Sequence, residues 1–438
     1  MAATATDAGD RARRPRRSDH SLTTLDSGVR VITERVPGVR SVALGFLVDT
    51  GSVVERPEQA GISHLLEHML FRGTEHYGSQ EIDELFDEMG AEINAGTDKE
   101  STTLYTRVLD GHLERAFDVM ADMIWRPRFG ELDAEKDVVL EEIAMYEDDP
   151  QDRVFDLIGR AVFGAHPLGR PVIGTAASVA AVQREQLAAF HAERYRPGSI
   201  VVAAAGSVEH EALVELVERA QGGGDSAAAP RPAENGVEFE RRREFLQKDT
   251  EQYHVCVGGP GLARDDERRY ALRVLEGILG GTSSSRLFQE IRERRGLAYS
   301  VFCFSNLYAG TGELGIYLGT RPDKIDEALE VLAGELRRCV EDPASEEELA
   351  RSRENLKGRM VLALESTSAR MGRLGGSLIA GMPILTADEV IERIDAVRIE
   401  HLRELAEELY AGERLSLAGV GADAGAFERA AASLLEGS

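Results

Sequence analysis

The stretch Gly222-Gly223-Gly224-Asp225-Ser226-Ala227-Ala228-Ala229-Pro230-Arg231-Pro232 lies at the midpoint of this 438-residue chain. It has few large apolar side chains that could pack into a core, and its glycines and prolines are typical of a linker. We therefore predict two domains, residues 21–221 and 236–438, joined by a linker at residues 222–235. Each half is long enough to bury a hydrophobic core of its own.

The two halves on either side of this linker have similar sequence patterns. Leu66-Glu67-His68-Met69-Leu70 resembles Leu275-Glu276-Gly277-Ile278-Leu279, and Glu88-Met89-Gly90-Ala91 resembles Arg294-Arg295-Gly296-Leu297. We interpret this as a diverged internal duplication. The alternative is that unrelated domains of strands and helices share such short matches by chance, since matches of this length are weak evidence.

Strands and helices interleave in the first half. The hydrophobic pattern predicts strands at residues 42–48, 93–97 and 102–108, and helices at residues 60–71, 80–89, 112–125 and 132–146. Because these elements do not follow a strict strand-helix-strand rhythm, we expect an α+β fold. In each half, a mixed and mostly antiparallel sheet would be packed by helices.

The composition excludes several classes of protein. Lys and Arg total 51 and Asp and Glu 77, which gives a formal charge of −26, and such an acidic surface repels nucleic acid. No apolar run is long enough to span a membrane. The cysteines are few and widely spaced, which argues against a disulfide framework and fits a reducing compartment; they are Cys256, Cys303 and Cys339.

Residues 1–20 form an Arg-rich tail that we expect to be disordered. No apolar segment follows the arginines, so the tail is not a secretory signal. A mitochondrial transit peptide would also be rich in Arg and Ser, but Asp7, Asp10 and Asp19 count against that assignment. We expect a bacterial-type cytoplasmic location, with the mitochondrial matrix as the alternative.

The sequence His64-Leu65-Leu66-Glu67-His68 contains the strongest chemical signal. On a helix, His68 lies about 40° from His64 and Glu67 about 60° to its other side, so all three share one face. Two imidazoles at i and i+4 suit Zn²⁺, and the carboxylate beside them can take a proton from an attacking water. This is the inverted H-x-x-E-H order of zinc peptidases. The alternative is two surface histidines near an ordinary glutamate, but the flanking apolar residues would bury this helix.

A hydrolytic zinc site needs a third protein ligand, and the helix at 132–146 supplies candidates. Leu132, Val139, Ile143 and Tyr146 define its buried stripe. Relative to Val139, Glu142 lies at about −60° and Glu135 at about −40°, whereas Glu141 lies at about −160° and faces solvent. Glu142 is therefore a plausible ligand, with Glu135 behind it as a supporting group. The alternative is that this acidic helix simply presents a solvated face.

At these residues the chain resembles the pitrilysin and insulysin family of zinc peptidases, most closely the shorter members related to mitochondrial processing peptidase and its bacterial relatives. The resemblance covers nearly the whole chain after Ser21. In that family the motif is paired with a downstream glutamate in an E-x6-E pattern, here Glu135 and Glu142, with 142 − 68 = 74 residues from His68 to Glu142. The resemblance implies one Zn²⁺ per chain, held by His64, His68 and Glu142, with Glu67 as general base and Glu135 as the supporting carboxylate.

Two further segments match the family. Asn94-Ala95-Gly96-Thr97 resembles the edge strand that accepts the substrate backbone by β-augmentation, and Asn94 would bind substrate or the zinc site. In the second half, Arg292 and Tyr299 match the family's R-x6-Y pair, whose side chains can donate hydrogen bonds to the reacting carbonyl oxygen. Without the resemblance, Arg292 would be an ordinary exposed arginine and Tyr299 a core strand residue.

The second half has no metal motif of its own. When Leu66 is aligned with Leu275, Arg273 and Gly277 replace the two histidines. We therefore expect the two halves to face each other across a chamber, with zinc in the first half only. The run Gly280-Gly281-Thr282-Ser283-Ser284-Ser285-Arg286 lacks the phosphate-loop pattern, and we treat it as a loop.

The sequence thus predicts a zinc metalloendopeptidase that hydrolyses unfolded peptides or presequence-like segments. The charge of −26 favours basic peptides, although an acidic surface more often serves solubility alone. The alternative is a non-catalytic structural or partner subunit of a processing-peptidase-like complex. Because one chain carries both the zinc motif and the Arg292/Tyr299 pair, we expect a homodimer, with a heterodimer with a paralogue as the second possibility.

Overall fold

A computed structural model describes residues 20–221, 227–229, 237–342 and 344–436. Most of the predicted linker, and the predicted tail up to residue 19, lie outside these ranges, so their character stays a prediction. His20, which we placed in the tail, is the first residue of a strand. The elements of the first half are, in chain order, β1 (His20–Thr24), β2 (Arg30–Arg35), β3 (Ser41–Val48), α1 (Ile62–Leu70), α2 (Ser79–Glu88), β4 (Ile93–Thr97), β5 (Thr102–Leu109), α3 (Leu113–Trp125), α4 (Leu132–Asp148), α5 (Pro150–Phe163), α6 (Ala176–Ala181), α7 (Arg184–Arg194), β6 (Ile200–Gly206) and α8 (His210–Ala220).

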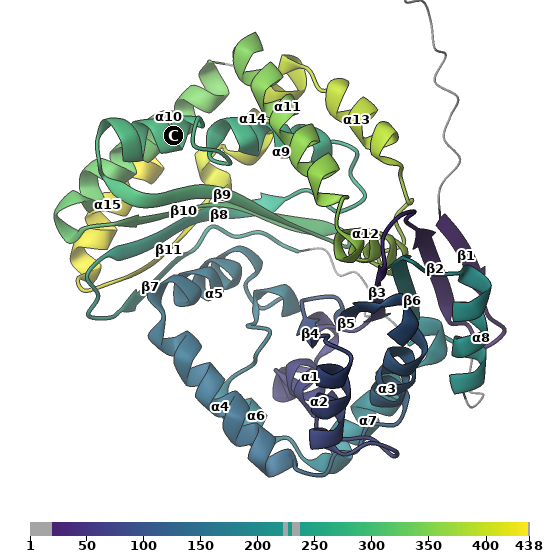
Figure 1. Cartoon of the computed structure of the whole chain (residues 1–438). Coiled ribbons are helices and arrows are strands. Elements are labelled where there is room, and N and C mark those ends of the chain that lie inside the picture. Colours follow the sequence, from purple (N-terminus) through teal and green to yellow (C-terminus); the bar gives the residue numbers. More distant parts are fainter. Residues whose placement is uncertain (1–19, 222–226, 230–236, 343, 437–438) are drawn as a thin grey trace, which may run out of the picture.

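The second half repeats this order of elements from β2 onward (Figure 1). A π-helical segment, η6, stands where the first half has α2. The elements are β7 (Arg243–Gln247), β8 (Tyr253–Gly261), α9 (Arg269–Leu279), η6 (Phe288–Arg294), β9 (Ala298–Tyr308), β10 (Thr311–Thr320), α10 (Ile325–Glu341), α11 (Glu346–Ala363), α12 (Thr367–Ile379), α13 (Ala387–Asp395), α14 (Ile399–Leu409), β11 (Ser416–Gly421) and α15 (Ala424–Glu436).

The two sheets have the same topology. The first has the strand order β1-β2-β6-β3-β5-β4 and the second β7-β11-β8-β10-β9. In both, the outermost pair of the shared five strands is parallel, β2 with β6 and β7 with β11, and the other pairs are antiparallel. This agreement confirms the α+β fold class with two homologous domains. The residue boundaries assigned to those domains stay a prediction.

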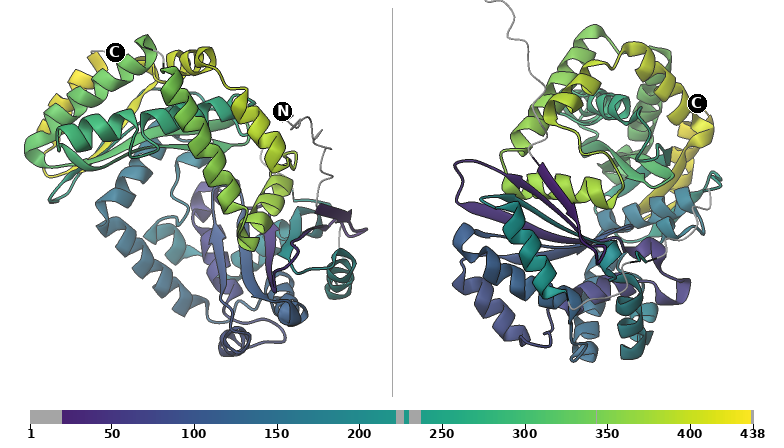
Figure 2. Two further views of the ribbon diagram at one scale, coloured as in Figure 1. Left: turned by 45° about the horizontal axis from the view of Figure 1, so that its top comes forward. Right: turned by 90° about the vertical axis from the view of Figure 1, so that its right-hand side faces the viewer.

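The halves exchange one helix each. The first sheet packs one face on helices of its own half, including α1 and α3, and its other face on α12 from the second half. In return, α5 from the first half covers one face of the second sheet, whose other face packs on α9, α10 and α14. Figures 1 and 2 show α5 beneath the second sheet and α12 against the first. The two sheets are therefore joined by helices that cross between halves.

Glycines allow α12 to approach the first sheet closely. A Cβ at Gly375 would lie 2.4 Å from a methyl carbon of Leu47, and one at Gly45 would lie 2.5 Å from the sulfur of Met371. Contacts this short are closer than van der Waals packing allows. Beside them, buried Glu34 on β2 pairs with Arg373 at 2.9 Å and with Arg370, both on α12. The exchanged helix is thus fixed by packing and by charge.

A second ion pair joins the halves next to the expected site. Glu100, in the loop after β4, pairs with Arg264 and accepts a hydrogen bond from the amide of Ala309 at 2.9 Å. Beyond these contacts the halves enclose a cavity of about 430 Å³. In the described part of the chain, every helix is too short or too polar to cross a membrane. The cytoplasmic location stays a prediction.

The structure corrects the predicted buried stripe of helix α4. Leu132, Val139 and Ile143 are buried as expected, but Tyr146 is 41% exposed. The helix continues past the core at this point, and Tyr146 lines the cavity instead. The 3.6-residue period places a side chain on a face of the helix, but it does not show where the core beneath that face ends.

Candidate metal centre

Helix α1 is anchored in the core of the first half by four buried side chains, Leu65, Leu66, Met69 and Leu70. The carboxylate of Glu55 caps its start, because the amides of Gly61 and Ser63 each donate to one of its oxygens at 2.8 Å. Gly61 has a φ of 90°, and a Cβ there would lie 2.5 Å from the carbonyl oxygen of Ile173, so this position requires glycine. These contacts fix the direction of the opposite face of the helix.

That face brings His64 and His68 together with Glu142 from α4. Oε2 of Glu142 lies 3.4 Å from Nε2 of His68 and 3.8 Å from Nε2 of His64. One ligand atom of each residue lies within 4.8 Å of the others, and no other such group of metal ligands occurs among the described residues. Zn²⁺ binds such atoms at about 2.0–2.2 Å, which places tetrahedral donors roughly 3.4 Å apart. The donor set therefore fits Zn²⁺.

Glu135 supports this cluster from behind. It is 3% exposed, and His68 Nδ1 lies 2.8 Å from its Oε1. Its other oxygen accepts a hydrogen bond from Arg72. With Nδ1 donating to Glu135, Nε2 of His68 keeps its lone pair directed at Glu142, which is the arrangement a metal ligand requires. By contrast, Glu141 is exposed, as the sequence predicts.

The electrostatics of the cluster favour a bound cation. Burial, together with neighbouring His68, lowers the pKa of His64 to about 4, so its ring is neutral at pH 7. Burial acts in the same direction on His68, but the hydrogen bond and charge of Glu135 and the charges of Glu142 and Glu67 raise the pKa of His68. Three carboxylates thus surround two imidazoles, and a metal ion would replace the proton on His68.

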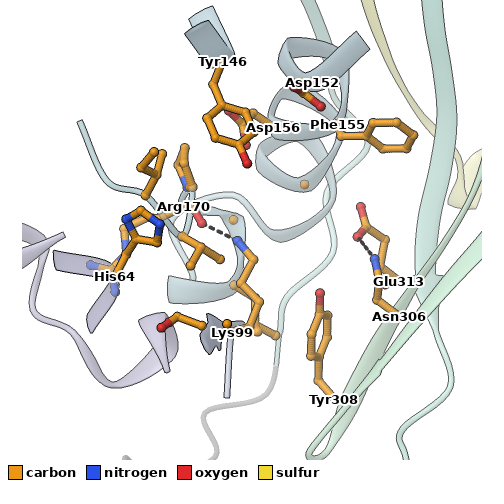
Figure 3. A pocket seen from close by; sticks show the side chains of 18 of the residues that line it. His64, Lys99, Tyr146, Asp152, Phe155, Asp156, Arg170, Asn306, Tyr308 and Glu313 are labelled. Carbon is orange, nitrogen blue, oxygen red and sulfur yellow. Dashed lines mark hydrogen bonds between the residues drawn. The ribbon is translucent and has the colours of Figure 1, made fainter. Parts of the chain in front are cut away.

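Glu67 lies on the same face of α1 as His64 and lines the same cavity. Figure 3 shows His64 at this cavity. Its Oε2 is buried and has no hydrogen-bond partner among the described residues. Burial raises the pKa of Glu67, and the charge of Glu142 adds to this, against hydrogen bonds from Thr97 and the charge of His68. A carboxylate with a raised pKa suits proton transfer near neutral pH.

Strand β4 forms the edge of the first sheet beside this cavity. In the described residues it pairs with β5 alone, so its outer backbone groups are free to pair with an extended peptide. Gly96 and Thr97 line the cavity. Asn94 and Ala95 lie farther along the strand, and the exposed Asn94 side chain accepts a hydrogen bond from the amide of Ala95 at 2.8 Å.

The structure also brings Arg292 and Tyr299 together, but it does not place them at the cavity. The Arg292 guanidinium lies 4.4 Å from the ring centre of Tyr299. Tyr299 is 76% exposed, so the alternative that it is a core strand residue is wrong. It is the second residue of strand β9, whose far end carries the cavity-lining Tyr308, nine residues or roughly 30 Å away. Neither Arg292 nor Tyr299 belongs to the described residues that line the cavity.

Sequence reasoning missed several residues that line the cavity, namely Lys99, Asp152, Asp156 and Glu313. Asp152 and Asp156 are four residues apart on α5, so a helical wheel places them on one face. Glu313 is the one charged residue in strand β10, Thr311–Thr320, where it interrupts an otherwise uncharged run. These signals mark unusual positions in the sequence, but only the tertiary structure shows that they meet at one cavity.

Family models match both halves of the chain. The model for insulinase, peptidase family M16, matches residues 30–176, and the model for the peptidase M16 inactive domain matches residues 181–356. His64, Glu67, His68, Glu135 and Glu142 all fall within the first match.

Curated bacterial proteins resemble the chain over most of its length. A protein of Streptomyces coelicolor, described as an uncharacterized zinc protease, is 42% identical over 408 residues, 91% of this chain and 89% of the relative. A protein of Bacillus subtilis with the same description is 41% identical over 389 residues, 88% of this chain and 95% of the relative.

Solved structures share the fold. A protease from Helicobacter pylori matches with a TM-score of 0.86 at 20% identity, covering 92% of this chain and 99% of that chain. A peptidase M16 inactive domain from Pseudomonas fluorescens also has a TM-score of 0.86 at 20% identity, covering 93% and 99%.

Proposed function

Because the chain belongs to the insulinase family of peptidases, family M16, we propose that it is a zinc metalloendopeptidase with Glu67 as its general base. The observation that carries this proposal is the cluster of His64, His68 and Glu142, which lies beside Glu67 at a cavity along an edge strand. The same residues support one Zn²⁺ per chain.

Metal binding, ligand orientation and proton transfer are assigned to different side chains of the site. His64, His68 and Glu142 would hold the metal, and Glu135 would orient His68. A zinc ion bound there supplies Lewis acidity toward the scissile carbonyl and lowers the pKa of a water molecule to about 7. Glu67 takes a proton from the attacking water and passes it to the departing amine. Its unpartnered Oε2 is free to accept that proton.

An extended, unfolded peptide fits the cavity better than a folded protein does. The free edge of β4 offers backbone hydrogen bonds to a peptide segment, with Gly96 and Thr97 nearest the site and Asn94 and Ala95 farther along. The acidic side chains of Asp152 and Asp156 line the same cavity, which supports a preference for basic peptides. Presequence-like segments would meet both requirements.

A homodimer explains the placement of Arg292 and Tyr299. Within one chain the pair lies away from the cavity, although its donors suit an oxyanion. We infer that these two residues serve the site of a second copy. A heterodimer with a paralogue would need the same contact surfaces, but the chain already carries both sets of residues.

The second candidate function is a non-catalytic structural or partner subunit. The inactive-domain match at residues 181–356 would favour it if it covered the metal cluster. The cluster lies instead within the peptidase match at residues 30–176, and each of its positions carries a residue able to bind zinc or transfer a proton. We therefore place the catalytic proposal first.

The deciding experiment compares the wild-type chain with Glu67→Gln on a mixture of unstructured peptides, read by mass spectrometry. The variant should keep stoichiometric zinc and lose about 10²–10⁴-fold in cleavage rate, because it removes the general base alone. Glu141→Gln, on the exposed side of α4, is the matched control and should cleave like wild type. If wild-type protein holds zinc and cleaves nothing, a structural role or a missing partner takes the place of the peptidase proposal.

A further inference from the structure

Glu313 is a buried acid that the proposed mechanism does not use. It lies on β10 in the second half, is 5% exposed, and lines the same cavity as His64 and Glu67. Its Oε2 accepts a hydrogen bond from Asn306 at 3.2 Å, whereas Oε1 has no hydrogen-bond partner among the described residues. Figure 3 shows this pair on the wall of the cavity that the second sheet forms, opposite His64.

The fold itself gives no reason for an acid at this position. The other residues of β10 are uncharged, and Glu313 pairs across the sheet with Pro260 and Asn306. No lysine or arginine nitrogen of the described residues lies within 4.0 Å of its carboxylate. Burial of a carboxylate that lacks a partner is unfavourable unless another group compensates. A ligand with N–H donors and a positive charge would supply that compensation.

The rest of the cavity suits a long side chain with a cationic end. Asp152 and Asp156 come from α5 in the first half, and Asp156 already pairs with Arg153 at 3.2 Å. Lys99 donates its ammonium group to the carbonyl oxygen of Arg170 and makes no ion pair with Glu313 within 4.0 Å, although its charge still acts on that carboxylate from a distance (Figure 3). Aromatic side chains complete the walls and can pack on methylene groups or on a guanidinium; they are Tyr146, Phe155, Phe304 and Tyr308.

We propose that Glu313 is a specificity-determining residue that binds the cationic end of an arginine or lysine side chain of the peptide. This inference rests on the proposed peptidase function and deepens it. The second half, whose described residues form no group of metal ligands, would thereby select the substrate for chemistry performed in the first half. The cavity borders Glu67 and the edge strand, so the residue selected lies close to the scissile bond.

The same arrangement makes selectivity depend on pH. Burial raises the pKa of Glu313 to about 7, opposed by the hydrogen bond from Asn306 and the charge of Lys99. The other titratable groups near it are Tyr308 and Cys256, whose own pKa values are raised, so both are uncharged at pH 7. A cation binds the ionised carboxylate. Preference for basic peptides should therefore weaken as the pH falls through 7.

The test uses paired peptides that differ only in arginine or citrulline, its uncharged analogue, at each position next to the scissile bond. The measured quantity is the ratio of kcat/KM for the arginine peptide to that for the citrulline peptide. Glu313→Gln should lower this ratio roughly tenfold to a hundredfold, because the site loses a charged hydrogen-bond partner. Cleavage of the citrulline peptide should stay near wild type. Glu251→Gln, an exposed acid of the same half, controls for the loss of one negative charge.

Two further measurements test the role of Glu313: the pH dependence of the kcat/KM ratio and the affinities of the two peptides. In wild-type protein the same ratio should fall between pH 8 and pH 6, which needs no variant, and a ratio that stays constant over this range contradicts the proposal. In a Glu67→Gln background, the affinities of the two peptides report binding without turnover. Equal affinities there, or an unchanged ratio in Glu313→Gln, would overturn the role of Glu313. If wild-type protein cleaves neither peptide, the peptidase proposal fails. The role of Glu313 is then decided by binding alone, from the two peptide affinities in Glu67→Gln measured with and without Glu313→Gln.

Discussion

Glu135 lies behind the metal cluster and orients His68, one of the proposed ligands, without binding the metal itself. It accepts hydrogen bonds from both His68 and Arg72 and is almost fully buried. Without it, the His68 ring would be free to rotate or to carry its proton on Nε2, the nitrogen that faces Glu142. We therefore expect zinc affinity at the proposed site to depend on a carboxylate that is not itself a ligand.

Glu135→Gln should weaken zinc binding by about 10–100-fold, since glutamine keeps the shape of the side chain but removes its charge. Competition for zinc with a chromophoric chelator measures this directly. At saturating zinc, turnover should return to near the wild-type value, because Glu135 positions His68 and does not touch the substrate.

Glu141→Gln is the matched control on the same helix, where the side chain faces solvent. It should bind zinc as tightly as wild type. If Glu135→Gln also keeps wild-type affinity, the positioning role of Glu135 is wrong. A variant that saturates with zinc and still fails to turn over would indicate a more direct role for Glu135.

At the level of single residues, the sequence predicts the metal cluster better than it predicts the cavity. His64, Glu67 and His68 are neighbours on one helix. The angles on a helical wheel separate Glu142 from Glu141, so local geometry is enough to predict the members of the cluster. Glu313 and Lys99 are far apart in sequence and meet only after folding. No local period could have identified them as cavity residues.

At the level of elements, capping and charge stabilise the start of helix α11 in the second half. The Ser345 side chain accepts a hydrogen bond from the amide of Glu348, whose carboxylate makes two 2.8 Å hydrogen bonds with Arg286. These contacts, the Arg286 hydrogen bond above all, hold the pKa of Glu348 at about 2. Helix α11 packs on α9, the counterpart of α1, so this cap stabilises the helix layer of the second half.

Glu348→Gln should lower the free energy of unfolding by about 1–2 kcal/mol at pH 7, allowing for partial solvent screening of the ion pair. The pKa of Glu348 in the folded protein lies below its ordinary value of 4.5, so this stabilisation is present above pH 4.5 and is lost as the pH falls toward 2. Urea titrations of wild type and variant at pH 7 and pH 4 should show the difference between them shrinking at the lower pH.

Glu347→Gln separates the ion pair from the helix dipole. Glu347 is in the same first turn, is exposed, and has no ion pair among the described residues, so its charge acts mainly on the helix dipole. Its substitution should cost a few tenths of a kcal/mol with little change between the two pH values. A Glu348→Gln effect no larger than this would show that the Arg286 pair adds nothing to stability.

The sequence does not predict that α5 and α12 are exchanged between the two halves. The sequence of each helix has apolar residues at helical spacing. The sequence does not show that the two helices are counterparts, which follows from the order of elements in the structure, or that each packs on the sheet of the other half. That choice depends on close approach at Gly45 and Gly375 and on the pairing of Glu34 with Arg370 and Arg373, all of which are long-range contacts.

At the level of the whole molecule, the two halves share one fold but contribute different residues to the proposed site. The first half holds the metal cluster, and the second carries Gly277 where His68 stands in the first. A Cβ at Gly277 would lie 2.4 Å from the Ser352 hydroxyl, so α11 occupies the space that a second metal ligand would need. The second half contributes walls to the cavity and the Arg292/Tyr299 pair, which the structure leaves at a distance from the metal cluster of its own chain.

This separation predicts complementation between two inactive variants. Glu67→Gln removes the general base, and Arg292→Ala removes the donor that we assign to the partner's site. In a dimer containing one chain of each variant, one site combines an intact Glu67 with an intact Arg292, and the other site lacks both. Such heterodimers, isolated by tandem affinity tags, should recover about half of wild-type activity per dimer, whereas each variant homodimer stays inactive or nearly so. Heterodimers as inactive as the two homodimers would show that Arg292 acts within its own chain, so that the two halves must close on each other to bring it to the metal cluster.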